Sequence, residues 1–309
     1  MKWLELAAGY ACNCRCIGCQ ACSAASTDQM APADVLAWLQ RGRRQGADHL
    51  WLGGGEPTLR RDFLATLRAA RQLGYQRIKV QTNGMLFAYP AFAQKAVAAG
   101  VTEVNLLLRT LDPSLHDELH QTPGAHAAMR AGLQALQATN VRLEGDVLLT
   151  TSTFRELPTL VEAYAREGLR HFNLWLFSAY EGGDAVRDLV PRLADLTPVL
   201  RQARAAADRE GVTLCTLHTP PCTTPPELWD GLFDAAGMAL VVVQPDGRAF
   251  AMETSAYEQG VYAGVCEGCA ARGACRGLRR DYVAIHGDRE AIALSRADVA
   301  GRDLVGRTL

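Results

Sequence analysis

The sequence lacks a long apolar run, and it lacks an excess of charge of either sign. No stretch of the 309 residues approaches the roughly 20 consecutive apolar residues that span a bilayer. The opening residues, Met1–Leu6, are too few and too acidic for a secretory signal, so we expect a cytoplasmic protein. The 32 basic side chains oppose 33 acidic ones, and the net charge of −1 provides no basic footprint for nucleic acid. We therefore expect neither a membrane nor a nucleic acid as a partner.

The familiar motifs of several enzyme classes are also missing. The chain contains no G-x-S-x-G, H-E-x-x-H, Walker or G-x-G-x-x-G sequence. Among the seven histidines, only His116 and His120 stand four residues apart, beside Asp117 and Glu118. We expect these two histidines on a solvated helix face.

Cysteine is absent from the middle of the chain. Five cysteines lie between residues 12 and 22, five lie between residues 215 and 275, and none lies between the two groups. A cytoplasmic protein keeps its thiols reduced, and a disulfide scaffold would spread them along the chain. Two tight clusters therefore predict two metal sites.

Strand and helix patterns alternate through the first part of the chain. Apolar runs typical of buried parallel strands are followed by amphipathic stretches, and glycines follow several helix ends. The strand-like runs are 3–7, 49–52, 77–81, 104–108, 147–149 and 172–177, and the helical stretches are 33–45, 62–73, 92–99, 125–138, 157–167 and 193–210. These units predict an α/β fold, a partial (β/α)6 barrel around a parallel sheet, and are too few for a full eight-unit barrel.

A proline-rich segment interrupts this pattern after residue 217. Proline lacks the backbone donor, so residues 219–226 fit neither a helix nor a central strand. We therefore expect a barrel domain over 1–217 and a small appendage over 218–309. Residues 240–243 and 248–252 flank Asp246-Gly247, which predicts a β-hairpin in that appendage, with a helix beside it.

The first cysteine group contains the spacing C-x3-C-x2-C. Cys12, Cys16 and Cys19 directly follow the first expected strand, at the end of a barrel where active-site loops lie. Three thiolates on one short loop can hold three irons of a [4Fe–4S] cluster and leave the fourth iron open for S-adenosylmethionine (SAM). A zinc site or a set of buried thiols is the alternative that the spacing alone leaves open.

In its position after the first strand, this spacing resembles the defining motif of the radical SAM superfamily. Gly53–Pro57, which follows the second strand, is similar to the family's GGEP motif, and Thr82-Asn83-Gly84 is similar to its TNG segment. The resemblance covers most of the chain. It implies a [4Fe–4S] cluster bound to SAM, whose reductive cleavage gives a 5′-deoxyadenosyl radical that abstracts hydrogen from a substrate.

The resemblance also implies a SAM site on the strand-end loops. Backbone carbonyls and Glu56 would accept from the SAM ammonium group, Arg109 would clamp its carboxylate, and Asp146 would accept from ribose or substrate. A plain turn at 82–84, a surface salt bridge for Arg109 and a structural role for Asp146 are the alternatives. The expected SAM-binding residues are Gly54, Gly55, Glu56, Pro57, Thr82, Asn83, Arg109 and Asp146.

The first cysteine group departs from the family pattern at Gly18. Many members have an aromatic residue there that packs on adenine, so adenine stacking must come from elsewhere in this chain. Cys14 and Cys22 are additional cysteines. We expect Cys14 to point away from the three ligands, and both to be free thiols.

The second cysteine group contains the spacing C-x2-C-x5-C at Cys266, Cys269 and Cys275. It resembles the SPASM and shorter twitch appendages of radical SAM enzymes and implies one auxiliary [4Fe–4S] cluster. Cys222 is the expected fourth ligand, with Cys215 as runner-up and His218 third. Four cysteines also make a structural zinc site, which is the alternative.

The expected substrate is a peptide or a small molecule. We expect no peptide-recognition domain before the strand at 3–7, an expectation that favours a small substrate or a peptide presented by a partner. The resemblance implies an electron donor such as flavodoxin or ferredoxin, and an auxiliary cluster that aids oxidation or substrate binding. In an epimerase, Cys215, Cys14 or Cys22 would serve as the hydrogen donor. The alternative from another class is a non-catalytic iron–sulfur or zinc protein on a barrel scaffold.

Overall fold

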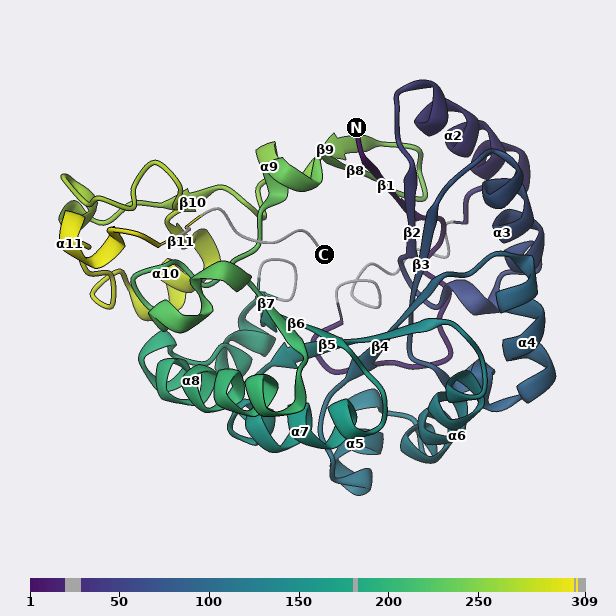
Figure 1. Ribbon diagram of the computed structural model, residues 1–309, viewed down its shortest axis with the longest axis horizontal. Helices are drawn as coiled ribbons and strands as arrows, with labels where there is room; N and C mark the ends of the chain where they lie inside the picture. Colours follow the sequence, from purple (N-terminus) through teal and green to yellow (C-terminus); the bar gives the residue numbers. More distant parts are fainter. Residues whose placement is uncertain (20–28, 180–182, 303, 305–309) are drawn as a thin grey trace. The chain divides into compact units, whose positions relative to one another are not determined.

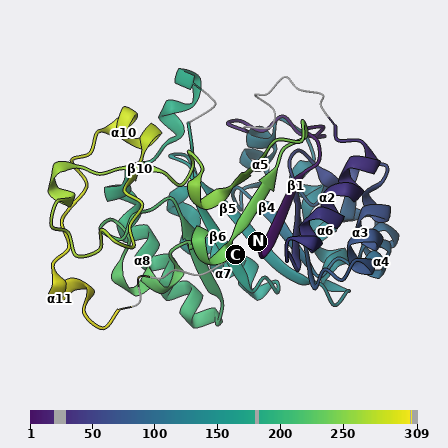
Figure 2. The same cartoon turned by 90° about the horizontal axis from the view of Figure 1, so that it is seen from above.

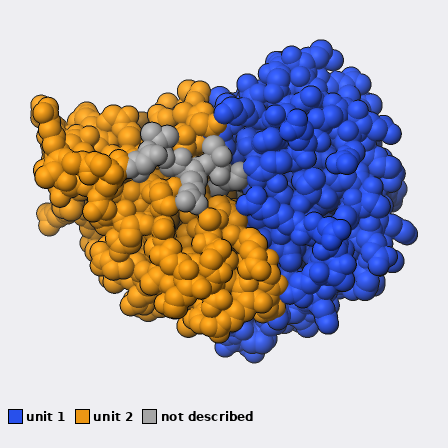
Figure 3. Space-filling view, in the orientation of Figure 1, with its two compact units in different colours: residues 1–145, 238–251 blue, residues 146–237, 252–309 orange. Residues whose placement is uncertain are grey.

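The computed structural model describes residues 1–19, 29–179, 183–302 and 304. Its internal contacts divide the chain into two units. Unit 1 comprises Met1–Gly145 and Met238–Ala251, and unit 2 comprises Asp146–Gly237 and Met252–Leu309 (Figure 3). The boundary at residue 217, between a barrel and an appendage, stays a prediction.

Unit 1 alternates strands and helices, as the sequence predicts. Its helices α2, α3 and α4 lie along one side of strands β1, β2 and β3 (Figure 1; Figure 2). Its elements are β1 (Trp3–Ala7), α2 (Pro32–Arg44), β2 (His49–Gly53), α3 (Phe63–Gln72), β3 (Arg77–Thr82), α4 (Pro90–Ala99), β4 (Glu103–Leu108), α5 (Pro113–His120), α6 (Ala125–Gln137), β8 (Leu240–Val243) and β9 (Ala249–Ala251), and β5 (Arg142–Leu149) carries the chain into unit 2.

Unit 2 continues the alternation and then changes to short elements. Strands β10 and β11 are two residues long and pair antiparallel, with Val261 opposite Leu278. The elements after β5 are α7 (Leu157–Arg166), β6 (His171–Leu176), α8 (Leu193–Glu210), β7 (Thr213–Leu217), α9 (Ala235–Met238), β10 (Gly260–Val261), β11 (Leu278–Arg279), α10 (Arg280–His286) and α11 (Arg296–Val299).

The main sheet has nine strands in the order β7-β6-β5-β4-β3-β2-β1-β8-β9. The pairs β1–β2, β2–β3, β3–β4 and β6–β7 are parallel. Their apolar residues form the core, because helices cover strands that water does not reach: Leu4, Leu50, Ile78 and Val104 are fully buried. The predicted α/β fold with a mostly parallel sheet is confirmed.

The predicted hairpin is present, but its position was not anticipated. Strands β8 and β9 pair antiparallel, and Gly247 adopts a φ of 83° in the turn between them. Strand β8 also pairs in parallel with β1, with Leu240 opposite Trp3, so the hairpin extends the main sheet. Among the described residues, no helix is long and apolar enough to cross a membrane.

Candidate functional site

The cysteine loop of unit 1, residues 12–19, is held against the end of α5. The backbone N–H of Arg15 donates to the carbonyl of His120 at 3.1 Å, and the N–H of Ile17 donates to the carbonyl of Leu119 at 2.9 Å. The N–H of Cys19 donates to the carbonyl of Cys16 at 3.1 Å and closes a turn. Gly18 occupies the third position of that turn with a φ of 72°, which favours glycine and explains its departure from an aromatic residue.

Two thiols of this loop, Cys12 and Cys16, have a lowered pKa. Hydrogen bonding from the Cys14 thiol, together with the charge of Arg109 and against burial, lowers the pKa of Cys16 to about 7. Hydrogen bonding from Cys14 also lowers the pKa of Cys12. A thiolate is the form that binds metal, so this donor set fits a cluster. The expectation that Cys14 points away from these cysteines is wrong, because its thiol hydrogen-bonds with both of them.

Cys14 itself is buried, with 2% of its surface exposed. Its sulfur lies 3.5 Å from the Met85 sulfur and accepts from the Asn83 side-chain amide at 3.6 Å. Met85 and Asn13, whose side-chain oxygen accepts from Asn83 at 2.7 Å, were not singled out by sequence reasoning. The position of Asn13 between Cys12 and Cys14 is the sequence feature that could have marked it as part of the site. Cys22 lies outside the described residues.

Glu56 joins the loops that follow β2 and β3. Its carboxylate accepts from the Thr58 N–H at 3.0 Å, from the Thr82 hydroxyl at 2.8 Å and from the Asn83 N–H at 2.8 Å. Burial raises the pKa of Glu56, and these hydrogen bonds oppose the rise. The structure therefore gives Glu56, Thr82 and Asn83 a shared positioning role. Their contact with SAM stays a prediction.

Gly54 and Gly55 allow the β2 loop to pack on the segment after β1. A Cβ on Gly54 would lie 2.5 Å from the Gly9 carbonyl oxygen, and one on Gly55 would lie 2.4 Å from the Ala11 carbonyl oxygen. The N–H of Gly55 donates to Gly9 at 2.8 Å. Backbone packing thus requires both glycines, and Pro57 begins the short helical turn that follows them. Their approach to SAM stays a prediction.

Arg109 lies beneath the cysteine loop and is 3% exposed. One of its terminal nitrogens donates to the Ile17 carbonyl at 3.2 Å, while its Nε has no hydrogen-bond partner. Burial lowers the pKa of Arg109, and the charges of Cys16 and Cys19 oppose that change. The alternative of a surface salt bridge is therefore wrong, because the side chain is buried beside thiols.

The histidine pair His116 and His120 does not lie on a solvated face. Each is 1% exposed, and their rings stack with centroids 4.0 Å apart. Burial lowers the pKa of His116 to about 3 and that of His120 to about 4. The expectation failed because the face of α5 that carries both histidines packs inward.

Asp146 belongs to unit 2 and is 1% exposed. Its carboxylate accepts from the Asn173 side-chain amide at 2.8 Å, and the Asn173 oxygen lies 2.8 Å from a His171 ring nitrogen. This chain of contacts across β5 and β6 supports the structural role. A contact with ribose stays a prediction.

The second cysteine group, Cys222, Cys266, Cys269 and Cys275, is gathered within unit 2. Burial raises the pKa of Cys275 to about 11, and the charges of the other three cysteines raise it further. Burial likewise raises the pKa of Cys222, with added repulsion from Cys266 and Cys269. Cys222 and Cys269 pack against an apolar cluster that contains Trp229 and Leu294.

Cys215, the runner-up for the fourth ligand, lies on a strand of unit 2. Cys215 is fully buried on β7, in register with Asn173 on β6. Among the described residues, no three His, Cys, Asp or Glu side chains are grouped around a position for a single metal ion. A [4Fe–4S] cluster instead takes one thiolate at each iron, and both ligand sets stay predictions.

Solved structures share this fold. The structure of SuiB from Streptococcus suis with SAM bound has a TM-score of 0.64 at 16% identity, over 80% of this chain and 59% of that one. The structure of anSMEcpe with bound AdoMet has a TM-score of 0.63 at 14% identity, over 95% of this chain and 92% of that one. At these identities the likeness concerns the fold, which is the partial barrel predicted from the sequence.

Curated relatives align with about half of the chain. A protein of Sulfurisphaera tokodaii named "Probable GTP 3′,8-cyclase" is 26% identical over 172 residues, which are 55% of this chain and 54% of the relative. A protein of the same name from Methanopyrus kandleri is 30% identical over 162 residues, or 52% of each chain. The alignments therefore span only about half the length of these relatives.

The family comparison matches the part of the chain that carries the cysteine loop, the Glu56 loop and the strands that position them. The model of the radical SAM superfamily matches residues 7–162. This chain belongs to the radical SAM superfamily and is an enzyme of that superfamily.

Proposed function

We propose that this enzyme reductively cleaves SAM and uses the resulting radical to abstract hydrogen from a peptide or a small molecule. Cys12, Cys16 and Cys19 would hold a [4Fe–4S] cluster and leave one iron for SAM. Such a cluster, when bound, supplies the electron that breaks a carbon–sulfur bond of SAM and yields the 5′-deoxyadenosyl radical.

The observation that carries this proposal is the state of the cysteine loop. Backbone hydrogen bonds to Leu119 and His120 hold the loop in place, and the pKa of Cys16 is lowered to about 7. Buried Arg109 places a positive charge beside Cys16 and keeps one nitrogen without a protein partner. The lowered pKa makes Cys16 easier to ionise near neutral pH, and Arg109 would provide a donor for an anionic group such as the SAM carboxylate.

The strand-end loops would receive the rest of SAM. Glu56 holds Thr82 and Asn83 in fixed positions, so that backbone carbonyls and side chains at 54–57 and 82–83 are rigid before SAM binds. Asp146 would accept from a ribose hydroxyl or from the substrate. Cys215 would serve as the hydrogen donor if the reaction is an epimerisation.

The second cysteine group would hold one auxiliary [4Fe–4S] cluster through Cys222, Cys266, Cys269 and Cys275. Its support is the gathering of these four thiols in unit 2, where the charges of Cys266 and Cys269 help to raise the pKa values of Cys222 and Cys275. Binding to iron removes that repulsion, because the ligands are then held as thiolates by positive charge. The auxiliary cluster would aid oxidation or substrate binding.

Two kinds of relative bear on the substrate. The sequence relatives are named for the cyclisation of GTP, a small molecule, and one SuiB structure contains the precursor peptide SuiA. We therefore keep both classes in the proposal, and we propose flavodoxin or ferredoxin as the class of electron donor.

Anaerobic reconstitution tests the proposal. The protein should turn brown, bind about eight irons per chain, and form 5′-deoxyadenosine from SAM with dithionite. A colourless protein that holds zinc, or a brown protein that never cleaves SAM, would overturn it.

A further inference from the structure

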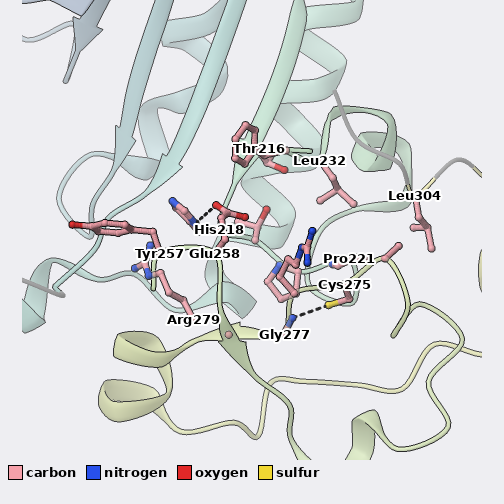
Figure 4. A pocket seen from close by; sticks show the side chains of 16 residues that line it. Thr216, His218, Pro221, Leu232, Tyr257, Glu258, Cys275, Gly277, Arg279 and Leu304 are labelled. Carbon is pink, nitrogen blue, oxygen red and sulfur yellow. Dashed lines mark hydrogen bonds and ion pairs between the residues drawn. The ribbon is translucent and has the colours of Figure 1, made fainter. Parts of the chain in front are cut away.

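A polar pocket in unit 2 lies beside the second cysteine group. Cys275 lines it together with residues that follow β7 and residues just before β10. Figure 4 shows His218 and Glu258 pointing toward each other across this pocket. The polar lining that carries the argument consists of Thr216, His218, Thr219 and Glu258.

The carboxylate of Glu258 is not satisfied by the protein. The residue is 8% exposed, and its Oε1 has no hydrogen-bond partner. The nearest opposite group is Nδ1 of His218 at 3.6 Å, which is too far for a direct hydrogen bond.

Two hydroxyl groups of the same lining also lack partners. Thr216 is 1% exposed and Thr219 is 6% exposed, and neither side-chain oxygen has a hydrogen bond. Buried polar atoms in proteins are nearly always paired. Three buried oxygen atoms without partners around one pocket therefore indicate a bound polar group, and the carboxylate of Glu258 favours a group that supplies donors.

The buried cation of the pocket is already engaged. Arg279 donates to the Asp281 carboxylate and to the carbonyls of Leu176 and Phe177. It does not provide a free charge for an anionic ligand. Arg276, the other cation of the lining, is exposed, so the buried charge that faces the pocket is the carboxylate of Glu258, which favours a donor-rich group over a second anion.

Backbone contacts keep this pocket in shape. Gly260 and Gly277 both line it, and a Cβ on Gly260 would lie 2.4 Å from the Arg276 carbonyl oxygen. His218 adopts a φ of 68°, a conformation that few residues other than glycine use. This left-handed backbone sets the direction in which the His218 side chain leaves β7 toward Glu258.

We propose that this pocket is a substrate subsite that binds a nitrogen group with several N–H donors, such as an amidine, an ammonium or a primary amide. Glu258 would accept from this group, and Thr216 and Thr219 would complete its hydrogen bonds. The subsite would hold the substrate beside the second cysteine group, so the inference rests on the proposed function.

Ligand-observed saturation-transfer NMR on the reconstituted protein tests this subsite. The probes are acetamidine, which presents N–H donors, and acetate, which has the same carbon skeleton and presents only acceptors. We expect saturation transfer to acetamidine and none to acetate. Glu258→Gln should weaken acetamidine binding about tenfold, the loss expected for one charge-assisted hydrogen bond.

Controls separate the subsite from general effects. Glu253→Gln changes an exposed carboxylate of the same unit and should leave acetamidine binding unchanged. If E258Q loses iron or fails to fold, Thr216→Val provides the test, because it removes a hydroxyl with little change of shape. Binding of acetate equal to that of acetamidine, or acetamidine binding that neither E258Q nor T216V weakens, would overturn the inference.

A separate assay of the same preparation, the formation of 5′-deoxyadenosine from SAM, tests the proposed function. A protein that cleaves SAM and does not bind acetamidine overturns the subsite alone. A protein that binds acetamidine at Glu258 and does not cleave SAM keeps the pocket and overturns the proposed radical chemistry.

Discussion

The two cysteine groups differ in the structure around them and in the direction in which the pKa values of their thiols are shifted. The loop 12–19 of unit 1 is hydrogen-bonded to α5, and its neighbours lower the pKa of Cys12 and Cys16. In the second cysteine group, Cys266, Cys269 and Cys275 lie between the two-residue strands β10 and β11, and burial raises the pKa of Cys222 and Cys275. The first site is thus shaped by the polypeptide, whereas the second depends more on what its thiols bind.

Removal of a thiol from the unit 1 loop should have the largest effect. Cys16→Ala should abolish 5′-deoxyadenosine formation and remove about half of the bound iron, because an incomplete ligand set does not hold a [4Fe–4S] cluster. Iron analysis and chromatography of the SAM products measure both quantities. Retained SAM cleavage in C16A would contradict the assignment of Cys16 as a ligand.

The matched change in unit 2 should separate the two cysteine groups. Cys275→Ala should also lose about half of the iron, but it should keep SAM cleavage in the absence of substrate. The same two assays apply. If C275A loses SAM cleavage as completely as C16A does, the two groups do not act independently and the contrast between them fails.

The buried hydrogen bonds that Glu56 accepts should stabilise unit 1. Glu56→Ala removes the acceptor of Thr58, Thr82 and Asn83 and leaves their donors buried, so the free energy of unfolding should fall by about 3 kcal/mol. Urea unfolding measures the change. Glu253→Ala, at an exposed position of unit 2, is the control and should stay within about 0.5 kcal/mol of the parent protein. Equal effects of the two variants would contradict the role of Glu56.

The histidines beneath the loop should make unit 1 sensitive to acid. In the folded protein the pKa of His116 is about 3 and that of His120 is about 4, below the ordinary value of 6.5. Between each folded value and 6.5, the unfolded chain therefore binds more protons than the folded protein does. The free energy of unfolding should therefore fall with pH below about 6.5, by about 1.4 kcal/mol per pH unit for each histidine. His116→Phe removes one of these groups, and urea unfolding at several pH values should show a shallower slope. An unchanged slope would mean that His116 is not buried as a neutral group.

Periodicity and spacing predicted much of this protein. The strand at 3–7 has the same limits in the structure, and the hairpin around Asp246-Gly247 forms as expected. Such features are local, because a strand pattern or a turn depends on residues close in sequence. The prediction for β5 was too short: the expected run began at 147, whereas the strand spans Arg142–Leu149. Two buried charged residues of this strand, Glu144 and Asp146, interrupt the apolar pattern.

Other features depend on partners that are distant in sequence. Burial of Arg109 under the cysteine loop, and of His116 and His120 in α5, reverses what their charge and polarity suggest. The pairing of β8 with β1 joins segments that are more than 200 residues apart in the sequence. No local pattern marks Glu258 as the partner of His218, since the two residues meet only through the fold.

By itself, the sequence determined the α/β alternation, the cysteine spacings and the family, because each is written in residues that are neighbours or regularly spaced. The tertiary structure decided the protonation preferences of the thiols, the positioning role of Glu56 and the polar pocket beside Cys275. These properties depend on burial and on hydrogen bonds between loops, and both arise only when separate segments pack together.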